Sequence, residues 1–254
     1  MALLNTNLLL ERVALGRING ATPLYLNGVN GASTTTYETL WDNSSLYTFL
    51  ATNMAAPTLV SSSANDTAAG TGARTVLVSG VNSSFVEVSE TVTLNGVGAV
   101  ALANSYMSIN SMRVLTAGTG GTNAGTLTLA SSTPTTHALM AISASMTTSF
   151  MYTVPADKTL MMLDLCVATR SATAGGNSLA IETIVNLSGV KTRKFFVPDT
   201  SATGGTPFFK FSIPLVFEEK TQINGLVISG AGTGPVTALA TCMLLDNTQD
   251  FLTQ

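Results

Sequence analysis

The chain has 254 residues, enough for one large β-domain or two small ones. Only 10% of its residues are charged, against about 25% in ordinary globular domains, and a net charge of −3 argues against nucleic acid as the main partner. A mean hydropathy of +0.37 would suit a membrane protein, yet the sequence has no run of about 18 apolar residues. A weakly charged, hydrophobic chain of this kind favours a protein that buries its surface against neighbours.

Residues 1–55 differ from the rest and are predicted to form an extended N-terminal arm. Their leucines are irregularly spaced, and glycines and Pro23 interrupt any long helix. A short helix is expected over residues 44–54, ending before Pro57. Trp41, at the entrance to this helix, is expected to anchor the arm onto a β-domain.

Residues 56–131 are predicted to form a first β-unit. Apolar and small polar residues alternate here over short runs that end at Gly or Asn pairs, which is the pattern of half-buried strands. The expected strands cover residues 58–62, 74–79, 85–94, 99–102, 106–117 and 126–130.

Two charged residues of this unit fall on otherwise apolar strand faces, Glu90 on one strand and Arg113 on another. A charge taken out of water without a partner is costly. We therefore predict a structural ion pair between Glu90 and Arg113 or, failing that, between Glu90 and Arg74. A single paired carboxylate without a second acid, a histidine or a metal beside it favours this role over catalysis.

Residues 132–254 are predicted to form a second β-unit, which begins with a linker that contains Pro134. Its expected strands cover residues 138–144, 150–154, 159–169, 179–187, 191–197, 208–217, 221–229 and 236–245. Eight strands of this length suit a jelly roll or a related two-sheet sandwich. A tight turn is expected after Pro155, with Asp157 at a position that tolerates left-handed backbone. The predicted fold class is all-β, with antiparallel sandwich or jelly-roll-like units and an extended N-terminal arm.

The loops and side chains of the second unit favour packing over ligand binding. Its Gly-rich loops at residues 172–177, 201–207 and 231–235 lack the aromatic and charged residues that sugars or metals need. The basic residues of the expected strand at 191–197 are interpreted as protection of a sheet edge; they are Lys191, Arg193 and Lys194. The two cysteines, Cys166 and Cys242, lie in separate apolar runs and are predicted to be free thiols.

Motifs for catalysis, cofactors and metals are missing. His137 is the only histidine, and no Gly-x-Ser-x-Gly elbow accompanies it. The Gly-rich stretch 118–125 lacks the Gly-Lys-Ser/Thr of a phosphate loop, and a strand rather than a helix is expected after it. We predict no catalytic residue, no cofactor and no metal site, although carboxylates distant in sequence can meet in space.

Four stretches resemble a known family. They are Asn65-Asp-Thr-Ala-Ala-Gly-Thr-Gly-Ala-Arg-Thr-Val, Val86-Glu-Val-Ser-Glu-Thr-Val-Thr-Leu-Asn-Gly, Thr116-Ala-Gly-Thr-Gly-Gly-Thr-Asn-Ala-Gly-Thr and Tyr152-Thr-Val-Pro-Ala-Asp-Lys-Thr. Together they resemble β-rich virion proteins of tailed bacteriophages, especially aquatic ones, over residues 37–250. Asp157 stands where similar proteins often have Gly, a change that the turn should accept. The resemblance implies a structural role on the particle, in the head or in the tail.

Composition, architecture and resemblance together predict a non-enzymatic virion protein, a capsid decoration or cement subunit assembled in the host cytoplasm. We expect a homo-oligomer, specifically a trimer, that contacts the major capsid protein or other virion proteins and neither nucleic acid nor membrane. The alternative is a tail or fibre adhesin that binds the host surface. A depolymerase is a third possibility, which would need carboxylates converging in a groove.

Overall fold

The computed structural model describes residues 6–132, 135–169, 176–200, 206–229 and 234–248. The protein is all-β with antiparallel sheets, as predicted. Its elements are α1 (Thr6–Ala14), β1 (Ala21–Asn30), β2 (Glu38–Thr39), β3 (Thr58–Ser61), β4 (Ala73–Val81), β5 (Glu87–Thr93), β6 (Val100–Ala101), β7 (Ser108–Ala117), β8 (Leu127–Ala130), β9 (Thr136–Met140), β10 (Met151–Thr153), β11 (Lys158–Thr169), β12 (Asn177–Val185), β13 (Lys191–Thr200), β14 (Phe208–Phe217), β15 (Thr221–Ser229) and β16 (Val236–Asp246).

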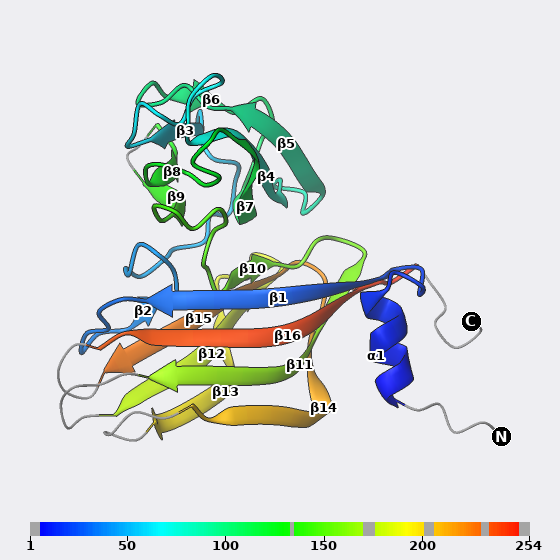
Figure 1. Ribbon diagram of the computed structural model, residues 1–254. Coiled ribbons are helices and arrows are strands. Elements are labelled where there is room, and N and C mark those ends of the chain that lie inside the picture. Colours follow the sequence, from blue (N-terminus) through cyan, green and yellow to red (C-terminus); the bar gives the residue numbers. More distant parts are fainter. Residues whose placement is uncertain (1–5, 133–134, 170–175, 201–205, 230–233, 249–254) are drawn as a thin grey trace.

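Two sheets form a jelly-roll unit. One has the order β1-β16-β11-β14, and the other has the order β10-β15-β12-β13, with β2 also paired to β15. When β1 and β10–β16 are numbered one to eight along the chain, these orders become 1-8-3-6 and 2-7-4-5, the arrangement of an eight-stranded jelly roll. The first sheet faces the viewer in Figure 1, with β1 uppermost and β14 lowest.

The core of the jelly-roll unit lies between its two sheets, where alternate side chains of each strand meet. Phe150 is fully buried at its centre, against two glycines. A Cβ atom on Gly225 would lie 2.6 Å from the Phe150 ring, and one on Gly28 would lie 2.6 Å from its Cβ. Glycine is therefore required at both positions because the backbone passes directly over this side chain.

A second unit, residues 56–148, is inserted between β2 and β10 and is called the inserted unit. It contains the sheets β6-β3-β8-β9 and β5-β4-β7, which enclose a separate core of Leu59, Val76, Val78, Met112, Leu127 and Leu129. In Figure 1 it stands above the β1 edge of the jelly-roll unit. Strand pairing thus joins β1, which precedes the inserted unit, to strands that follow it.

The expected boundary at residues 131 and 132 is wrong, because it divides a pair of hydrogen-bonded strands. β8 ends just before it, β9 follows it, and the two strands pair from Leu127 with Met140 onward. β9, which was expected to be the first strand of the jelly roll, belongs to the inserted unit. We propose that the units are residues 56–148 and the two flanking segments together.

The arm expected over residues 1–55 supplies the missing jelly-roll strand. β1 pairs with β16 along its whole length, from Ala21 with Leu245 to Asn30 with Val236. The segment before β1 is helical, and Val13 of α1 packs with Met243 on the sheet. Packing against β16, near the other end of the sequence, therefore stabilises α1, and the spacing of residues within α1 does not reveal this contact.

The helix expected over residues 44–54 is also wrong. The segment crosses the outer face of the β10-β15-β12-β13 sheet as irregular chain, and its polar groups bond to distant partners. The Leu50 carbonyl accepts a hydrogen bond from Gln222 Nε2, and the Met54 N–H donates to the Tyr106 carbonyl. Trp41 is buried as predicted and donates from Nε1 to the Ser45 carbonyl.

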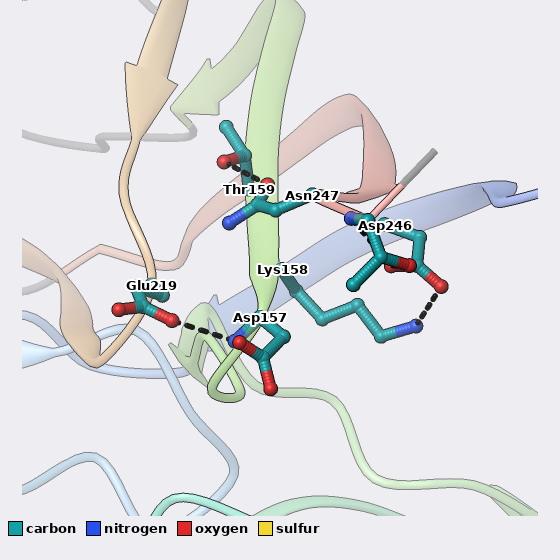
Figure 2. A network of polar contacts seen from close by, with 7 residues as sticks. Asp157, Lys158, Thr159, Glu219, Asp246 and Asn247 are labelled. Atoms are coloured by element: carbon teal, nitrogen blue, oxygen red, sulfur yellow. Dashed lines mark hydrogen bonds and ion pairs between the residues drawn. The ribbon is translucent and has the colours of Figure 1, made fainter. Parts of the chain in front are cut away.

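A polar network fixes the end of the sandwich where β11 begins and β16 ends (Figure 2). Lys158 Nζ lies 3.7 Å from an Asp246 carboxylate oxygen, and the Asp157 N–H donates to Glu219 at 2.6 Å. Asp157 has φ 60°, the left-handed geometry predicted for this turn. The network ties the β10–β11 turn, the β14–β15 turn and the end of β16 together.

Candidate interaction surface

An irregularity in β11 shapes the outer face of the β1-β16-β11-β14 sheet. Met162 pairs with Cys242 and Asp164 with Thr241, so Leu163 has no partner on β16. On the other side, Met162 pairs with Leu215 and Asp164 with Lys210, so residues 211–214 of β14 stand opposite Leu163 alone. An excess of residues on one strand forces it to bulge.

The bulge in β14 leaves an apolar side chain projecting from the edge of the sheet. Ile213 is 84% exposed, the highest exposure among the large apolar side chains that the structure describes. Pro214 follows it and restricts the backbone at the tip of the bulge. β14 pairs only with β11, so this projection lies on an edge strand. We call Ile213 and its bulge the knob.

A groove of about 270 Å³ lies on the same sheet, between α1 and the strands β1, β16 and β11. Apolar side chains make up most of its lining, which includes Leu10, Val13, Pro23, Tyr25, Leu163 and Met243. Glu11 adds a carboxylate to the wall formed by α1. The displaced Leu163 contributes to this lining, so the same irregularity of β11 shapes both the groove and the knob.

Other apolar side chains extend the exposed surface between these two features. Tyr25 is 62% exposed and Phe208 is 60% exposed, with Leu239 and Val216 exposed nearby on the same sheet. Several exposed apolar side chains on one sheet mark an interaction site more often than a free surface. The sheet is therefore the best candidate for contact with another protein.

Two charged side chains at this sheet lie outside the ion pairs of the described residues. The ion pairs of the described residues are Lys158–Asp246, Lys191–Glu182 and Lys220–Glu219. Lys210, beside the knob, and Glu11, in the groove wall, belong to none of them. One oxygen of Asp164 accepts a hydrogen bond from the Thr241 N–H at 3.3 Å.

Both cysteines are free, as predicted, and they lie on strands of this sheet. Burial raises the pKa of the Cys242 thiol to about 12, and the nearby charge of Asp164 acts in the same direction. Cys242 is therefore protonated at neutral pH and unsuited to nucleophilic or metal chemistry.

Glu90 and Arg113, the predicted ion pair, do not pair. Asn110 has no counterpart on β4, because Ser79 pairs with Ser111 and Gly80 with Ile109. This extra residue reverses the faces of the rest of β7. Met112 consequently faces the core, while Arg113 is exposed.

The Glu90 carboxylate accepts hydrogen bonds instead from two backbone N–H groups, those of Ala103 at 2.8 Å and Asn104 at 3.0 Å. Arg74, the alternative partner, donates from Nε to the Gly70 carbonyl. Glu90 also contributes to a raised pKa of Tyr106, after burial of the ring as the main cause. Its role is to hold the loop that follows β6.

A buried carboxylate that the sequence did not reveal organises the loops of the inserted unit. Asp66 is fully buried and accepts hydrogen bonds from the N–H groups of Ala73, Ala124 and Gly125 and from the Ser61 hydroxyl. The three N–H donors come from the Gly-rich stretches that carry the family resemblance. The stretch 118–125 is thus a loop bound around a protein carboxylate, a structural role in place of phosphate binding.

His137 lies buried in β9. Its Nε2 lies 3.0 Å from the Ser131 hydroxyl, while its Nδ1 is buried without a hydrogen-bond partner. Burial lowers the pKa of His137, which keeps the ring neutral at pH 7. A serine and a histidine meet here, but no carboxylate orients the ring and the ring is 1% exposed, so the pair does not form a triad.

The basic residues of β13 lie on an edge strand, as interpreted from the sequence. Lys191 Nζ lies 3.1 Å from Glu182, and the Arg193 guanidinium lies 4.7 Å from the centre of the Tyr37 ring. The loops 172–177, 201–207 and 231–235 fall largely outside the described residues. Within the described residues, no three His, Cys, Asp or Glu side chains cluster to hold a metal, and no helix is long and apolar enough to cross a membrane.

No family model matches the chain, and no curated protein matches it. Among solved structures, it is similar to infectious bursal disease virus, Gx strain, with 11% identity, 90% of this chain and 72% of that chain covered, and a TM-score of 0.28. The VP2 subviral particle of that virus gives 9% identity, 88% and 75% coverage, and a TM-score of 0.22. These weak neighbours are viral capsid proteins. TM-scores this low do not establish a shared fold.

Proposed function

We propose that the protein is a non-enzymatic structural component of a virus particle, and specifically a capsid decoration or cement subunit of a tailed bacteriophage. It functions as a homo-oligomer seated over joints between major capsid subunits. Its activity is binding, since apolar surface buried across several subunits opposes their separation by about 25 cal/mol per Å².

The observation that carries this proposal is the apolar outer sheet of the jelly-roll unit. Ile213, Tyr25 and Phe208 are largely exposed in a chain with only 10% charged residues. An isolated protein with such a surface tends to associate. This surface supports a role in assembly, and the polar side chains of Glu90, Asp66 and His137 are bound within the fold. The resemblance to phage virion proteins supports placement on the particle.

The location and copy number of the chain on purified particles test the proposal. We expect labelled antibody to decorate the head, and quantitative mass spectrometry to find hundreds of copies per particle. Particles that lack the protein should lose their genome at a lower temperature than complete particles. Label confined to the tail would contradict the cement role, and absence from purified particles would contradict any virion role.

The projecting inserted unit favours a second candidate, a tail or fibre adhesin. Figure 1 shows this unit projecting beyond the β1 edge of the jelly-roll unit, to which it is joined at β10, so it can reach a host surface while the jelly-roll unit binds the particle. Binding of the purified protein to host cells, lost after deletion of residues 56–148, together with a dozen or fewer copies per particle, would favour the adhesin. Host polysaccharide cleaved during incubation would instead indicate a depolymerase.

A further inference from the structure

We propose that copies of this chain associate head to tail, with the knob of one copy seated in the groove of the next. The occupant of the groove is therefore the Ile213 bulge of a second copy. The inference deepens the proposed function by naming its subunit contact. It rests on the geometry of the outer sheet and applies whether or not the oligomer is placed on a capsid.

The knob is suited to insertion into a partner. Ile213 is 84% exposed, and Phe208 and Val216 lie exposed on either side of it along β14. The conformational entropy lost on binding is small, because isoleucine is branched at Cβ and Pro214 already restricts the backbone. An apolar side chain held this far out of an edge strand is a liability unless a partner covers it.

The groove has the size and lining to receive it. Its volume of about 270 Å³ exceeds that of one aliphatic side chain, which leaves room for a neighbouring residue of the bulge. Leu10, Tyr25 and Met243 provide apolar contacts on three sides, from α1, β1 and β16. α1 is held in place by Val13, which is buried against the sheet, so the groove exists before a partner arrives.

Charge complementarity selects a second copy over an unrelated apolar partner. Lys210 is exposed three residues before the knob, and Glu11 is exposed in the groove wall. Neither side chain has an ion-pair partner within the described residues. Seating Ile213 in the groove of the next copy brings this cation and this carboxylate to the same contact. Opposite charges at the rim of an interface favour one orientation of the partner.

The positions of the two features imply a ring. The knob is on β14, at one edge of the sheet, and the groove lies toward β1, at the opposite edge. When each copy contacts one neighbour through its knob and another through its groove, a dimer leaves one knob and one groove free, and association continues until a ring closes. The smallest such head-to-tail ring is a trimer, which is also the oligomer proposed from the sequence.

The mass of the full-length protein in solution, measured by light scattering after size exclusion, tests the contact. We expect wild type to be a closed oligomer at micromolar concentration. Ile213→Asp and Leu10→Asp should each yield monomers, because either places a charge in an apolar contact. Ile142→Asp is the matched control: Ile142 is 61% exposed on the inserted unit, so its change should leave the mass unaltered.

Mixing the two monomeric variants distinguishes a head-to-tail contact from other interfaces. Leu10→Asp retains an intact knob and Ile213→Asp an intact groove, so an equimolar mixture should form a dimer of one copy of each and nothing larger. Reversing the charges gives an independent measurement. Lys210→Glu and Glu11→Lys should each weaken association at least tenfold, and the double variant should recover most of that loss.

Three results would overturn the inference: a monomeric wild type, an Ile213→Asp variant with wild-type mass, or variants that stay monomeric when mixed although circular dichroism shows both folded. These results can be distinguished from results that contradict the proposed function. A protein that forms the ring in solution but is absent from particles would refute the virion role alone. A protein found on the head that is monomeric in solution would refute only this contact.

Discussion

In the jelly-roll unit, long paired strands form one another's backbone hydrogen bonds. In the inserted unit, buried polar side chains also bond several backbone groups of the loops. β11 has 12 residues and β16 has 11, and they pair along nearly their whole length. In the inserted unit, β3 and β8 have 4 residues each and β6 has 2. Short strands leave many backbone N–H groups in loops, and these need partners when they are buried.

Asp66 and Asn123 supply those partners in the inserted unit. Asn123 is fully buried, donates to the carbonyls of Gly125 and Ala141, and accepts from the Ser145 N–H. The inserted unit therefore depends on these buried hydrogen bonds in addition to its apolar core, whereas long strand pairing and apolar packing hold the jelly-roll unit. Substitutions that remove each kind of interaction should affect one unit and spare the other.

The largest effect is expected from Phe150→Ala in the jelly-roll core. Phe150 is fully buried and fills the space above Gly28 and Gly225, so its removal leaves a cavity. We expect a loss of about 4 kcal/mol in the free energy of unfolding, measured by chemical denaturation. Hydrogen exchange should accelerate in β11–β16 and remain slow in β4. Val190→Ala, at a side chain 66% exposed in the loop after β12, is the control and should change stability by less than about 0.5 kcal/mol.

Asp66→Ala should produce the next largest effect, in the other unit. It leaves the N–H groups of Ala73, Ala124 and Gly125 without acceptors, and we expect a loss of about 3 kcal/mol. Hydrogen exchange should accelerate in β4 and β8 while β11–β16 stay protected. Glu87→Ala, at an exposed acid of β5, should have little effect. Equal acceleration in both units would show that they unfold as one, which would weaken the contrast between them.

Asn110→Ala tests the junction that joins the two units. The Asn110 side chain donates to the Thr153 carbonyl at 3.0 Å and accepts from the Thr153 N–H at 2.9 Å, which covers the free edge of β10. Thr153 is fully buried, so both of its backbone groups would lose their partners. We expect a loss of about 2 kcal/mol and faster exchange of the Thr153 amide. Asn43→Ala, which removes one exposed side-chain bond to the Ser45 hydroxyl, is the matched control.

Sequence patterns predicted most strands and failed where distant segments meet. The turn at Asp157 and the buried Trp41 follow from local chemistry and were predicted. The pairing of β1 with β16 joins residues at opposite ends of the chain, and no local pattern reports it. The irregular sequence pattern of residues 1–55 therefore gave no indication that residues 21–30 form a jelly-roll strand.

The Glu90–Arg113 prediction failed because of the same bulge in β7 that forms the junction between the two units. Alternation along residues 106–117 assumes an unbroken strand, but the extra residue Asn110 shifts the faces beyond it. That bulge is also what directs Asn110 toward Thr153. Asp66 was missed because its donors are brought together only by folding. An acidic residue in a loop otherwise made of Ser, Asn, Thr, Ala and Gly was the one available signal.

The smallest expected effect is the pH dependence of the inserted unit. Burial lowers the pKa of His137 below its ordinary value of 6.5, so the unfolded chain binds the proton more readily than the folded chain. The stability that depends on neutral His137 is complete above pH 6.5 and declines as the pH falls through and below that value. At pH 5.5 the loss from this group is at most about 1.4 kcal/mol.

Comparison of wild type with His137→Phe at pH 7.5 and pH 5.5 isolates this effect. The substitution keeps a buried ring beside Tyr47 and removes the titrating group. Burial raises the pKa of Asp42, whose protonation acts in the opposite sense at lower pH, but Asp42 is present in both proteins and cancels. We expect wild type to lose more stability than the variant on acidification. Equal losses would mean that protonated His137 is accommodated, and that the inserted unit tolerates a buried charge as well as buried hydrogen bonds.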